Sequence, residues 1–502
     1  MKLLADLPYV DASRIGVTGH SNGAQASREA VFLDNEADQQ LIAAVLLVSN
    51  DPIFTEENTM IGGTGKRRIY VTAQDTYFNM FGNRDAGVVA CKYDEFMHGY
   101  GNEDGSYTSP RDYIHQPHAQ SFLYFGTDPS GKEERSSYTL YTETIDGQEA
   151  IRAIYDPDII HPWAHFSAGV VESSVEFFDA ALDAPVKLAA GNQTWQVKAA
   201  FNLLGIVGFF MFIVSFAAVV AGTKHFAALR QADRPAAEQA PQGAGKAWFW
   251  GSLAAGVVFA MLTYPAIYRW CNSVRPAFFN QPATFYIAVW TLLCGLFTIL
   301  SMVVCYHAFA KKNGFNAGAK GLKLSAGQWG KTIALALLVV VSAFGLVFAA
   351  DYFFGVDFRL WVVTLRAFEA GKFAEIVKFL PFYLVYYVAL SVSVNCFNYN
   401  KLGKHEWVNT LVNCAAVALG PVLMCVIQYG YFFSTGYLVT EAFDFGGPII
   451  GIWLFPIIVY LPLAVVVSRK IYKSSGNPYL GGLIMGTVVA VASCTNTLTY
   501  LI

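Results

Sequence analysis

Residues 199–221 read AAFNLLGIVGFFMFIVSFAAVVA, an apolar stretch without a single charged side chain. An α-helix rises about 1.5 Å per residue, and the hydrocarbon core of a bilayer is about 30 Å thick. A helix of this length can therefore cross a membrane. Because hydrocarbon offers no water to the backbone, each amide must be bonded within its own segment, which makes the stretch helical.

Similar stretches follow as far as the C-terminus. The 502 residues are 54% hydrophobic and only 14% charged, whereas charged residues make up roughly a quarter of a soluble protein. The composition predicts a soluble domain over residues 1–190 and an all-α polytopic transmembrane bundle of about eight helices over residues 191–502. The predicted spans are about 199–221, 247–268, 283–309, 332–354, 376–396, 408–432, 448–467 and 479–501.

The placement of Lys and Arg predicts the orientation of these spans, because cytoplasmic loops carry an excess of positive charge. With residues 1–190 outside the cytoplasm, fourteen positive side chains fall in cytoplasmic loops and six fall in outer loops or at their edges. We therefore expect a multi-pass protein of the cell membrane with an extracytoplasmic N-terminal domain. The fourteen are Lys224, Arg230, Arg234, Lys246, Lys311, Lys312, Lys320, Lys323, Lys331, Lys401, Lys404, Arg469, Lys470 and Lys473.

The polar residues inside the predicted spans are amides rather than charges. Asn202, Asn395, Asn413 and Asn496 lie within spans, and no Asp, Glu, Lys or Arg lies near the middle of one. These amides are compatible with a cavity for a polar substrate and with ordinary hydrogen bonds between helices. Residues 358–365 are too short to span and are expected to be interfacial or re-entrant.

The N-terminal part contains a motif with chemical meaning. Residues 14–18 (RIGVT) form a short β-branched run that predicts a strand, residues 24–33 predict a helix, and GHSNG at 19–23 joins them. This is the strand, sharp turn and helix that a G-x-S-x-G motif requires. We expect a strained turn at Ser21, with glycines on either side because bulk there would clash. Its hydroxyl would lie exposed at a helix N-terminus, where partial positive charge favours a developing anion.

Residues 10–23, with the lead-in Asp-x-x-Arg-Ile-Gly from Asp11 to Gly16, resemble the nucleophile elbow of the α/β-hydrolase superfamily. The resemblance is closest to the dienelactone-hydrolase and prolyl-oligopeptidase-like branch and covers roughly residues 3–182. It implies a partial α/β-hydrolase, a parallel sheet with flanking helices. A complete member has several strands before its elbow strand, whereas thirteen residues precede Arg14 here. We therefore expect an N-terminally incomplete version of a longer protein.

The family's catalytic residues follow the order Ser, acid, His. The resemblance implies that Ser21 is the nucleophile. Asp94, just past a strand predicted at 86–91, is the preferred acid. Asp75 is the alternative acid, and Asp51 is a third candidate. The ordinary interpretation of each of these aspartates is a turn or a helix cap.

The general base should follow the last strand of the family's sheet and precede its final helix. Residues 152–155 can be that strand, and residues 170–182 can be the helix. His161 and His165 lie between them, and His161 is preferred because it is closer to the strand. The resemblance further implies that the backbone N–H of Asn22 is half of the oxyanion hole.

The resemblance therefore implies a membrane-bound serine hydrolase of carboxylesterase type, acting on esters and less readily on peptides or amides. We expect activity of the full-length parent, since strands before the elbow supply the second oxyanion donor. The expected partners are the lipid bilayer and a small-molecule, acyl or peptidyl substrate. The net charge of −3 does not favour a nucleic acid, and no cofactor, metal or disulfide framework is expected. Two alternatives remain: a transport or lipid-handling protein whose hydrolase-like segment only binds, and a non-catalytic remnant.

Overall fold

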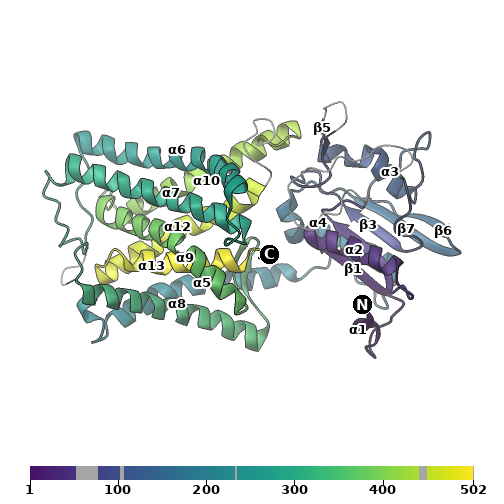
Figure 1. Cartoon of the computed structure of the whole chain (residues 1–502), viewed down its shortest axis with the longest axis horizontal. Coiled ribbons are helices and arrows are strands. Elements are labelled where there is room, and N and C mark those ends of the chain that lie inside the picture. Colours follow the sequence, from purple (N-terminus) through teal and green to yellow (C-terminus); the bar gives the residue numbers. More distant parts are fainter. Residues whose placement is uncertain (53–76, 102–106, 232–234, 440–448, 501–502) are drawn as a thin grey trace. The chain divides into compact units, whose positions relative to one another are not determined.

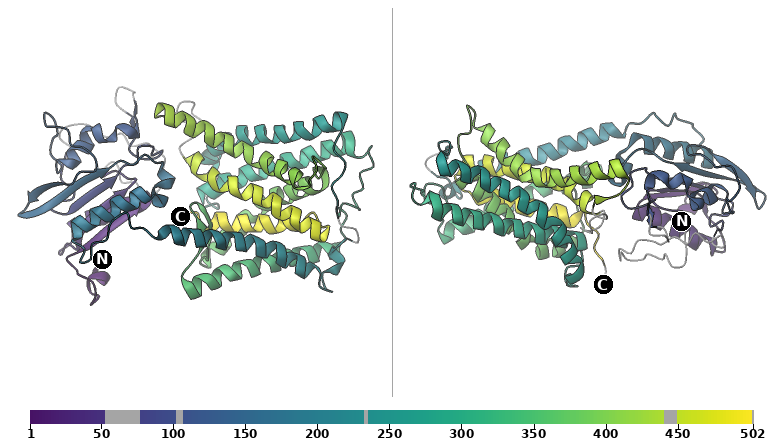
Figure 2. Two further views of the ribbon diagram at one scale, coloured as in Figure 1. Left: turned by 180° about the vertical axis from the view of Figure 1, so that it is seen from behind. Right: turned by 90° about the horizontal axis from the view of Figure 1, so that it is seen from above.

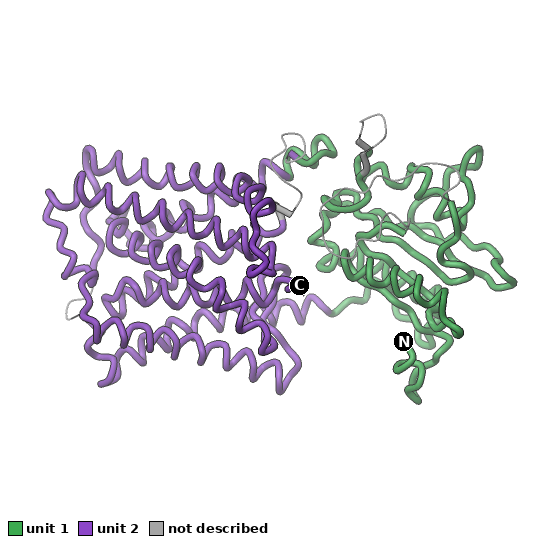
Figure 3. Tube along the Cα trace, in the orientation of Figure 1, with its two compact units in different colours: residues 1–194, 429–438 green, residues 195–428, 439–502 purple. Residues whose placement is uncertain are grey.

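The chain forms two compact units, which are described separately (Figure 3). The computed structural model describes residues 1–52, 77–101, 107–231, 235–439 and 449–500. Unit 1 consists of Met1–Thr194 together with Tyr429–Leu438, and unit 2 of Trp195–Gln428 together with Val439–Ile502.

Unit 1 is built on a five-stranded sheet in the order β1-β2-β3-β7-β6 (Figure 1). The strands are β1 (Ile15–His20), β2 (Ile42–Val48), β3 (Asp85–Val89), β7 (Gln148–Tyr155) and β6 (Tyr141–Ile145). The first four are parallel, and β6 pairs antiparallel with β7. The sheet is therefore mixed rather than wholly parallel as predicted.

Helices cover both faces of this sheet. Helices α2 (Asn22–Asn35) and α3 (Pro117–Leu123) share one apolar core with it, and α4 (Ala168–Leu182) contributes to a second core. Consecutive side chains of a strand point to opposite faces. Accordingly, Leu47 of β2 belongs to the first core and Leu46 to the second. Unit 1 is therefore a small α/β domain with the sheet between two helical layers.

Several shorter elements complete unit 1. They are α1 (Lys2–Ala5), the strand pair β4 (Tyr100–Gly101) and β5 (Tyr107–Thr108), and the 3-10 turns η3 (Pro110–His115) and η4 (His161–Phe166).

The antiparallel edge arises from a tight hairpin between β6 and β7. Asp146 and Gly147 form its two-residue turn, with φ values of 49° and 79°. Asp-Gly is a preferred sequence for such turns, because both residues tolerate positive φ. This dipeptide lies between β6 and β7, and it is the feature of the sequence that could have predicted β6.

A buried ion pair ties α2 to the start of β3. The guanidinium of Arg84 donates to Asp34 Oδ2 at 2.8 Å, and the two side chains are only 4% and 8% exposed. The carboxylate of Asp34 also accepts from the backbone N–H groups of Leu41 and Ile42, which lead into β2. Its two oxygens therefore join α2 to two other parts of unit 1, the start of β2 and the residue before β3.

Unit 2 is a bundle of helices that lie side by side in both views of Figure 2. Among the described residues, seven helices are long and apolar enough to cross a membrane. They are α5 (Trp195–Ala221), α6 (Gly243–Val274), α7 (Pro282–Cys305), α8 (Ala326–Phe354), α9 (Gly371–Val392), α10 (Trp407–Thr435) and α12 (Ile449–Ser475). The chain is therefore a multi-pass membrane protein.

The eighth predicted span, 479–501, is shorter than expected. Its helix, α13, covers only Leu480–Thr495, and most of its side chains are buried. Sixteen residues rise about 24 Å, less than the roughly 30 Å of hydrocarbon. The apolar sequence of this segment thus reflects burial within the bundle as much as contact with lipid.

Short elements connect the long helices. A 3-10 turn, η5 (Ala227–Leu229), follows α5, and the π-helical turns η6 (Tyr306–Ala310) and η7 (Ser393–Phe397) extend α7 and α9. Residues 358–365 form an antiparallel hairpin of β8 (Phe358–Leu360) and β9 (Val363–Leu365). The hairpin is thus the local structure of the segment for which an interfacial or re-entrant position is predicted.

The loops after α5, α7, α9 and α12 meet at one end of unit 2. Hydrogen bonds join them: Glu238 N–H to Tyr399 O, Lys401 N–H to Glu238 O, Gln231 N–H to Ser475 O, and Tyr472 OH to Lys320 O. These loops and the helix ends beside them carry the positive residues assigned to the cytoplasm, of which Arg234 is outside the described residues. Most of the positive side chains of unit 2 are thus gathered at one end.

We expect Asp34→Ala to lower the free energy of unfolding of unit 1 by about 3–5 kcal/mol, because Arg84 would be left buried without its counter-charge. The change would be measured by urea unfolding of the full chain in lipid nanodiscs, followed by pulsed proteolysis of unit 1. Asp38→Ala, which removes an exposed carboxylate nearby, should change stability by less than about 0.5 kcal/mol. Equal effects of the two substitutions would contradict the role given to the pair.

Candidate active site

Ser21 occupies a strained bend between β1 and α2. Its φ of 58° and ψ of −116° lie outside the regions that L-residues ordinarily adopt. The backbone is held on both sides: Ser21 N–H donates to Val48 O at 2.9 Å, and Asn50 Nδ2 donates to Ser21 O at 3.1 Å. Its hydroxyl makes no capping hydrogen bond to α2. The helix therefore does not use the group that the sequence singled out as a nucleophile.

The two glycines of the motif differ in what they permit. A Cβ on Gly19 would lie 2.2 Å from the backbone carbon of Gly23, so no side chain fits there. A Cβ on Gly23 would meet nothing within 4 Å among the described residues. The expectation that bulk at either position would clash is correct for Gly19 and wrong for Gly23.

Asp94 and His161 are hydrogen-bonded to each other. Nδ1 of His161 lies 2.8 Å and 2.9 Å from the two carboxylate oxygens of Asp94, and both side chains are buried. The preceding residues, Tyr93 and Ile160, form a parallel bridge that extends the pairing of β3 with β7. Since parallel strands end at the same edge of a sheet, that bridge brings the two side chains together.

The electrostatics of this pair are set by burial and mutual attraction. Burial alone would raise the pKa of Asp94, but the adjacent His161 and hydrogen bonds from backbone N–H groups lower that pKa to about 2. Burial alone would lower the pKa of His161, but the Asp94 carboxylate outweighs it and raises that pKa above the ordinary 6.5. Asp94 therefore remains an anion at neutral pH and orients the imidazole through Nδ1, leaving Nε2 to exchange a proton.

His20 connects the serine bend to this pair. Its Nε2 donates to the backbone carbonyl of His161 at 3.0 Å, and the two ring centroids are 4.6 Å apart. Burial, together with His161 and His165, lowers the pKa of His20 to about 3, so that its ring is neutral. The residue immediately before Ser21 is thereby fixed to the residue that would act as its base. The sequence assigned no such role to His20.

The remaining predicted site residues are less closely connected. His165 is exposed, and its ring centroid lies 5.2 Å from that of His20. Asn22 is the first residue of α2, where a backbone N–H has no acceptor within the helix, as an oxyanion donor requires. Asp75 lies outside the described residues. Asp51 is buried after β2, and its backbone carbonyl accepts from Arg28.

Glu95 is a further site residue that the sequence interpretation missed. Its Oε2 accepts from the backbone N–H of His161 at 2.7 Å, and its Oε1 accepts from Tyr429 OH within unit 1. Burial raises the pKa of Glu95 to about 7, against the lowering effect of the Tyr429 bond. The feature of the sequence that could have predicted this role is the pair of consecutive acids, Asp94 and Glu95, after a predicted strand. One carboxylate can bond to the side chain of a histidine and the other to its backbone N–H.

The arrangement is suited to acyl transfer. The buried carboxylate of Asp94 orients the imidazole of His161. Ser21 lies on a strained bend, and the residue before it, His20, donates to the backbone carbonyl of His161. A small cavity in unit 1, of about 30 Å³, lies elsewhere, beside Phe78 and Arg152. Within the described ranges, no group of three or more His, Cys, Asp or Glu is arranged to hold a metal ion.

Comparison of the chain with protein-family models, curated proteins and solved structures finds no match. The arguments about this site therefore rest on its geometry and its chemistry.

We expect Asp94→Asn to lower the pKa of His161, because the substitution removes the negative charge that raises it while the ring remains buried. Histidine-selective NMR of the full chain in detergent would follow this titration. Asp146→Asn is the matched control: it removes an exposed carboxylate from the β6–β7 turn, where asparagine also tolerates positive φ. A pKa of His161 that stays the same in Asp94→Asn would show that Asp94 does not set its charge.

Proposed function

We propose that the chain is a membrane-bound serine hydrolase in which Ser21, His161 and Asp94 act as nucleophile, base and orienting acid. The observation that carries the proposal is the bond from Asp94 to His161 Nδ1, with His161 tied through His20 to the bend at Ser21. The resemblance of residues 10–23 to a nucleophile elbow agrees with this assignment.

In the first half of the proposed reaction, Ser21 Oγ attacks the acyl carbon of an ester while His161 Nε2 takes the hydroxyl proton. The backbone N–H of Asn22 donates to the oxygen that becomes negative in the tetrahedral intermediate. Collapse of the intermediate breaks the carbon–oxygen bond to the alcohol, which leaves with the proton held by His161. The acyl group remains on Ser21.

In the second half, water attacks the acyl carbon and gives its proton to His161. The second tetrahedral intermediate releases the carboxylic acid, and Ser21 regains its proton from His161. Asp94 stays ionised throughout and stabilises the imidazolium that forms in each half. Esters are the preferred substrates, because resonance stabilises an ester bond less than an amide bond and an alkoxide is a better leaving group than an amide anion.

A second candidate function is transport or lipid handling, with unit 1 serving only to bind. One specific observation favours it: unit 2 encloses a cavity of ligand size. The two candidates are separated by the chemistry of Ser21, because a binding module needs no nucleophile.

We further propose that unit 1 lies outside the cytoplasm. The end of unit 2 that gathers positive charge should face the cytoplasm. Helix α5 begins at Trp195, directly after unit 1, and ends at Ala221, where the first of the positive loops follows. A helix that crosses the bilayer once would therefore place the attachment of unit 1 on the outer side.

We expect Ser21→Ala to abolish labelling of the full chain by a fluorophosphonate probe, which reacts with a serine hydroxyl activated by a base. Fluorescence of the labelled band after electrophoresis of membranes would measure the effect. Ser130→Ala, which removes an exposed hydroxyl of unit 1, should label like the unsubstituted chain. A correctly inserted full-length protein that never labels would favour the transport or remnant alternatives.

The orientation is tested by introduced cysteines. In intact cells, a membrane-impermeant maleimide should label Ser130→Cys, in exposed unit 1 sequence, but should label Ala319→Cys, in a positive loop, only after permeabilisation. The chain's own cysteines are buried or partly buried, so their labelling in the unsubstituted chain sets the background. The reverse pattern would place unit 1 in the cytoplasm.

A further inference from the structure

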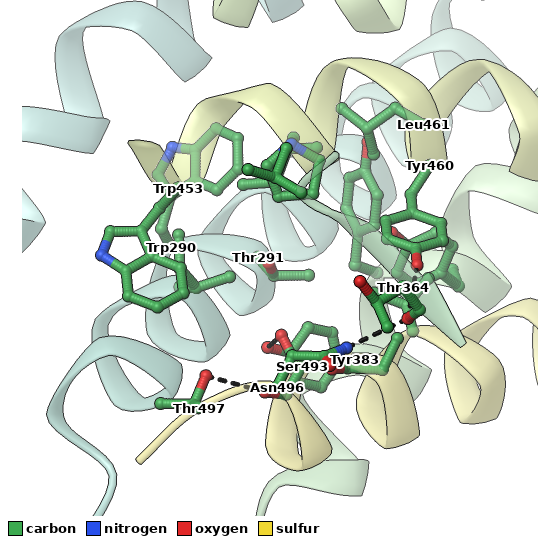
Figure 4. Close-up of a pocket in the computed structure, with 18 of the residues that line it drawn as sticks. Trp290, Thr291, Thr364, Tyr383, Trp453, Tyr460, Leu461, Ser493, Asn496 and Thr497 are labelled. Atoms are coloured by element: carbon green, nitrogen blue, oxygen red, sulfur yellow. Dashed lines mark hydrogen bonds between the residues drawn. The ribbon is translucent and has the colours of Figure 1, made fainter. Parts of the chain in front are cut away.

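Unit 2 contains a cavity of about 380 Å³ (Figure 4). Its walls come from α7, α9, α12, α13 and the β8–β9 hairpin. The volume is within the range of about 300–1,000 Å³ that small-molecule sites occupy. Because five separate segments converge on it, the cavity belongs to the interior of the bundle rather than to the surface of one helix.

Most of the wall is aromatic or aliphatic. Figure 4 shows Trp290, Trp453, Tyr460 and Leu461 around the space. Further lining side chains of the same character are Ile287, Tyr386, Tyr387, Ile457 and Val489. Such a wall favours an apolar chain or ring, because an apolar ligand is removed from water when it packs against these side chains.

The polar groups of the wall are largely bonded to each other. Tyr383 OH donates to Ser493 Oγ at 2.8 Å, and Asn496 Nδ2 donates to the Thr364 carbonyl at 3.0 Å. Asn496 thus lines the cavity and links the end of α13 to the β8–β9 hairpin, whereas Asn395 bonds to the Ser468 carbonyl of α12 and Asn413 to the Asn409 carbonyl of its own helix. Asn395 makes a hydrogen bond between helices of the kind predicted for the span amides, and a cavity for a polar substrate stays a prediction.

Two hydrogen-bond donors of the wall remain unused. Nε of Arg366 and Nε1 of Trp453 are buried, and neither has a hydrogen-bond partner among the described residues. A buried donor without an acceptor costs about 1–3 kcal/mol, and more when the group is charged. An acceptor supplied by a ligand would remove that cost.

The charge of the wall is positive. Arg359 and Arg366 line it, and no Asp or Glu is among its described lining residues. Arg359 is paired with Asp357 at 2.6 Å, whereas the acceptor that Arg366 meets among the described residues is neutral: one Nη donates to the carbonyl of Thr495. A guanidinium presents several donors in a planar fork that matches a carboxylate or a phosphate.

We propose that this cavity binds an amphiphile with one anionic headgroup, a carboxylate or a phosphate, and an apolar tail. The headgroup accepts hydrogen bonds from Arg366, and the tail lies among the aromatic side chains between Trp290 and Tyr460. This site is separate from the proposed esterase chemistry: it uses only residues of unit 2, and none of Ser21, Asp94 and His161 takes part.

The experiment uses the full chain in lipid nanodiscs and dibromostearate as the probe. Bromine quenches tryptophan fluorescence at short range, and Trp290 and Trp453 line the cavity. We expect a saturable quenching component with dibromostearate, and none with its neutral methyl ester, which is tested on Ser21→Ala so that the proposed esterase cannot convert it to the acid. Displacement by dodecyl phosphate would show that the site accepts either anion, whereas displacement only by laurate would narrow the proposal to carboxylates.

Two substitutions decide the outcome. Arg366→Gln should raise the dissociation constant of dibromostearate by at least about tenfold, because a charge-assisted bond is lost. Arg275→Gln makes the same charge change at an exposed arginine that does not line the cavity and should leave the constant unchanged. Equal affinities of Arg366→Gln and the unsubstituted chain, or equal quenching by the acid and its methyl ester, would overturn the proposal.

A third variant tests the space itself. Ala492→Phe places a bulky side chain in the cavity wall and should abolish the saturable component while the helical circular dichroism stays the same. If this variant does not insert, Arg366→Gln still decides. Ser21→Ala should bind the probe normally, so that failure of the hydrolase proposal and failure of this one are distinguishable.

Discussion

Backbone hydrogen bonds between the parallel strands β1, β2, β3 and β7 set the geometry on which the candidate active site depends. They place the carboxyl ends of all four strands at one edge of the sheet. Ser21 follows β1, Asp94 follows β3 and His161 follows β7, so residues up to 140 positions apart share that edge. The strained serine, the buried acid–base pair and the His20 link are all built on this register.

Much of this site was predictable from the sequence because its signals are local. A β-branched run, two glycines and a following helix predicted the bend at Ser21, and the resemblance to the family's order of catalytic residues pointed to Asp94 and His161. The roles of His20 and Glu95 were not predictable, because each depends on a contact with the backbone of His161 across the sheet. The space that would accommodate a side chain at Gly23 likewise depends on the neighbouring residues in the fold, which the motif does not specify.

In unit 2, too, local features were predictable from the sequence and those that depend on packing were not. Length and hydropathy predicted its long helices, but apolar sequence alone could not distinguish lipid contact from burial, which is why α13 was predicted too long. The cavity was beyond sequence reasoning, since its wall draws on five segments spread over about two hundred residues. In the sequence, Arg366 is indistinguishable from an ordinary charged loop residue, and only the structure shows that it lines the cavity.

Glu95 gives the candidate active site a second proton-binding group beside the imidazole. The pKa of Glu95 is raised to about 7 by burial, and that of His161 is raised by its anionic neighbours. A proton on the ring favours the ionised carboxylate, so uptake at one position opposes uptake at the other. The two groups are therefore coupled, and a proton on Glu95 removes part of the attraction that raises the pKa of His161.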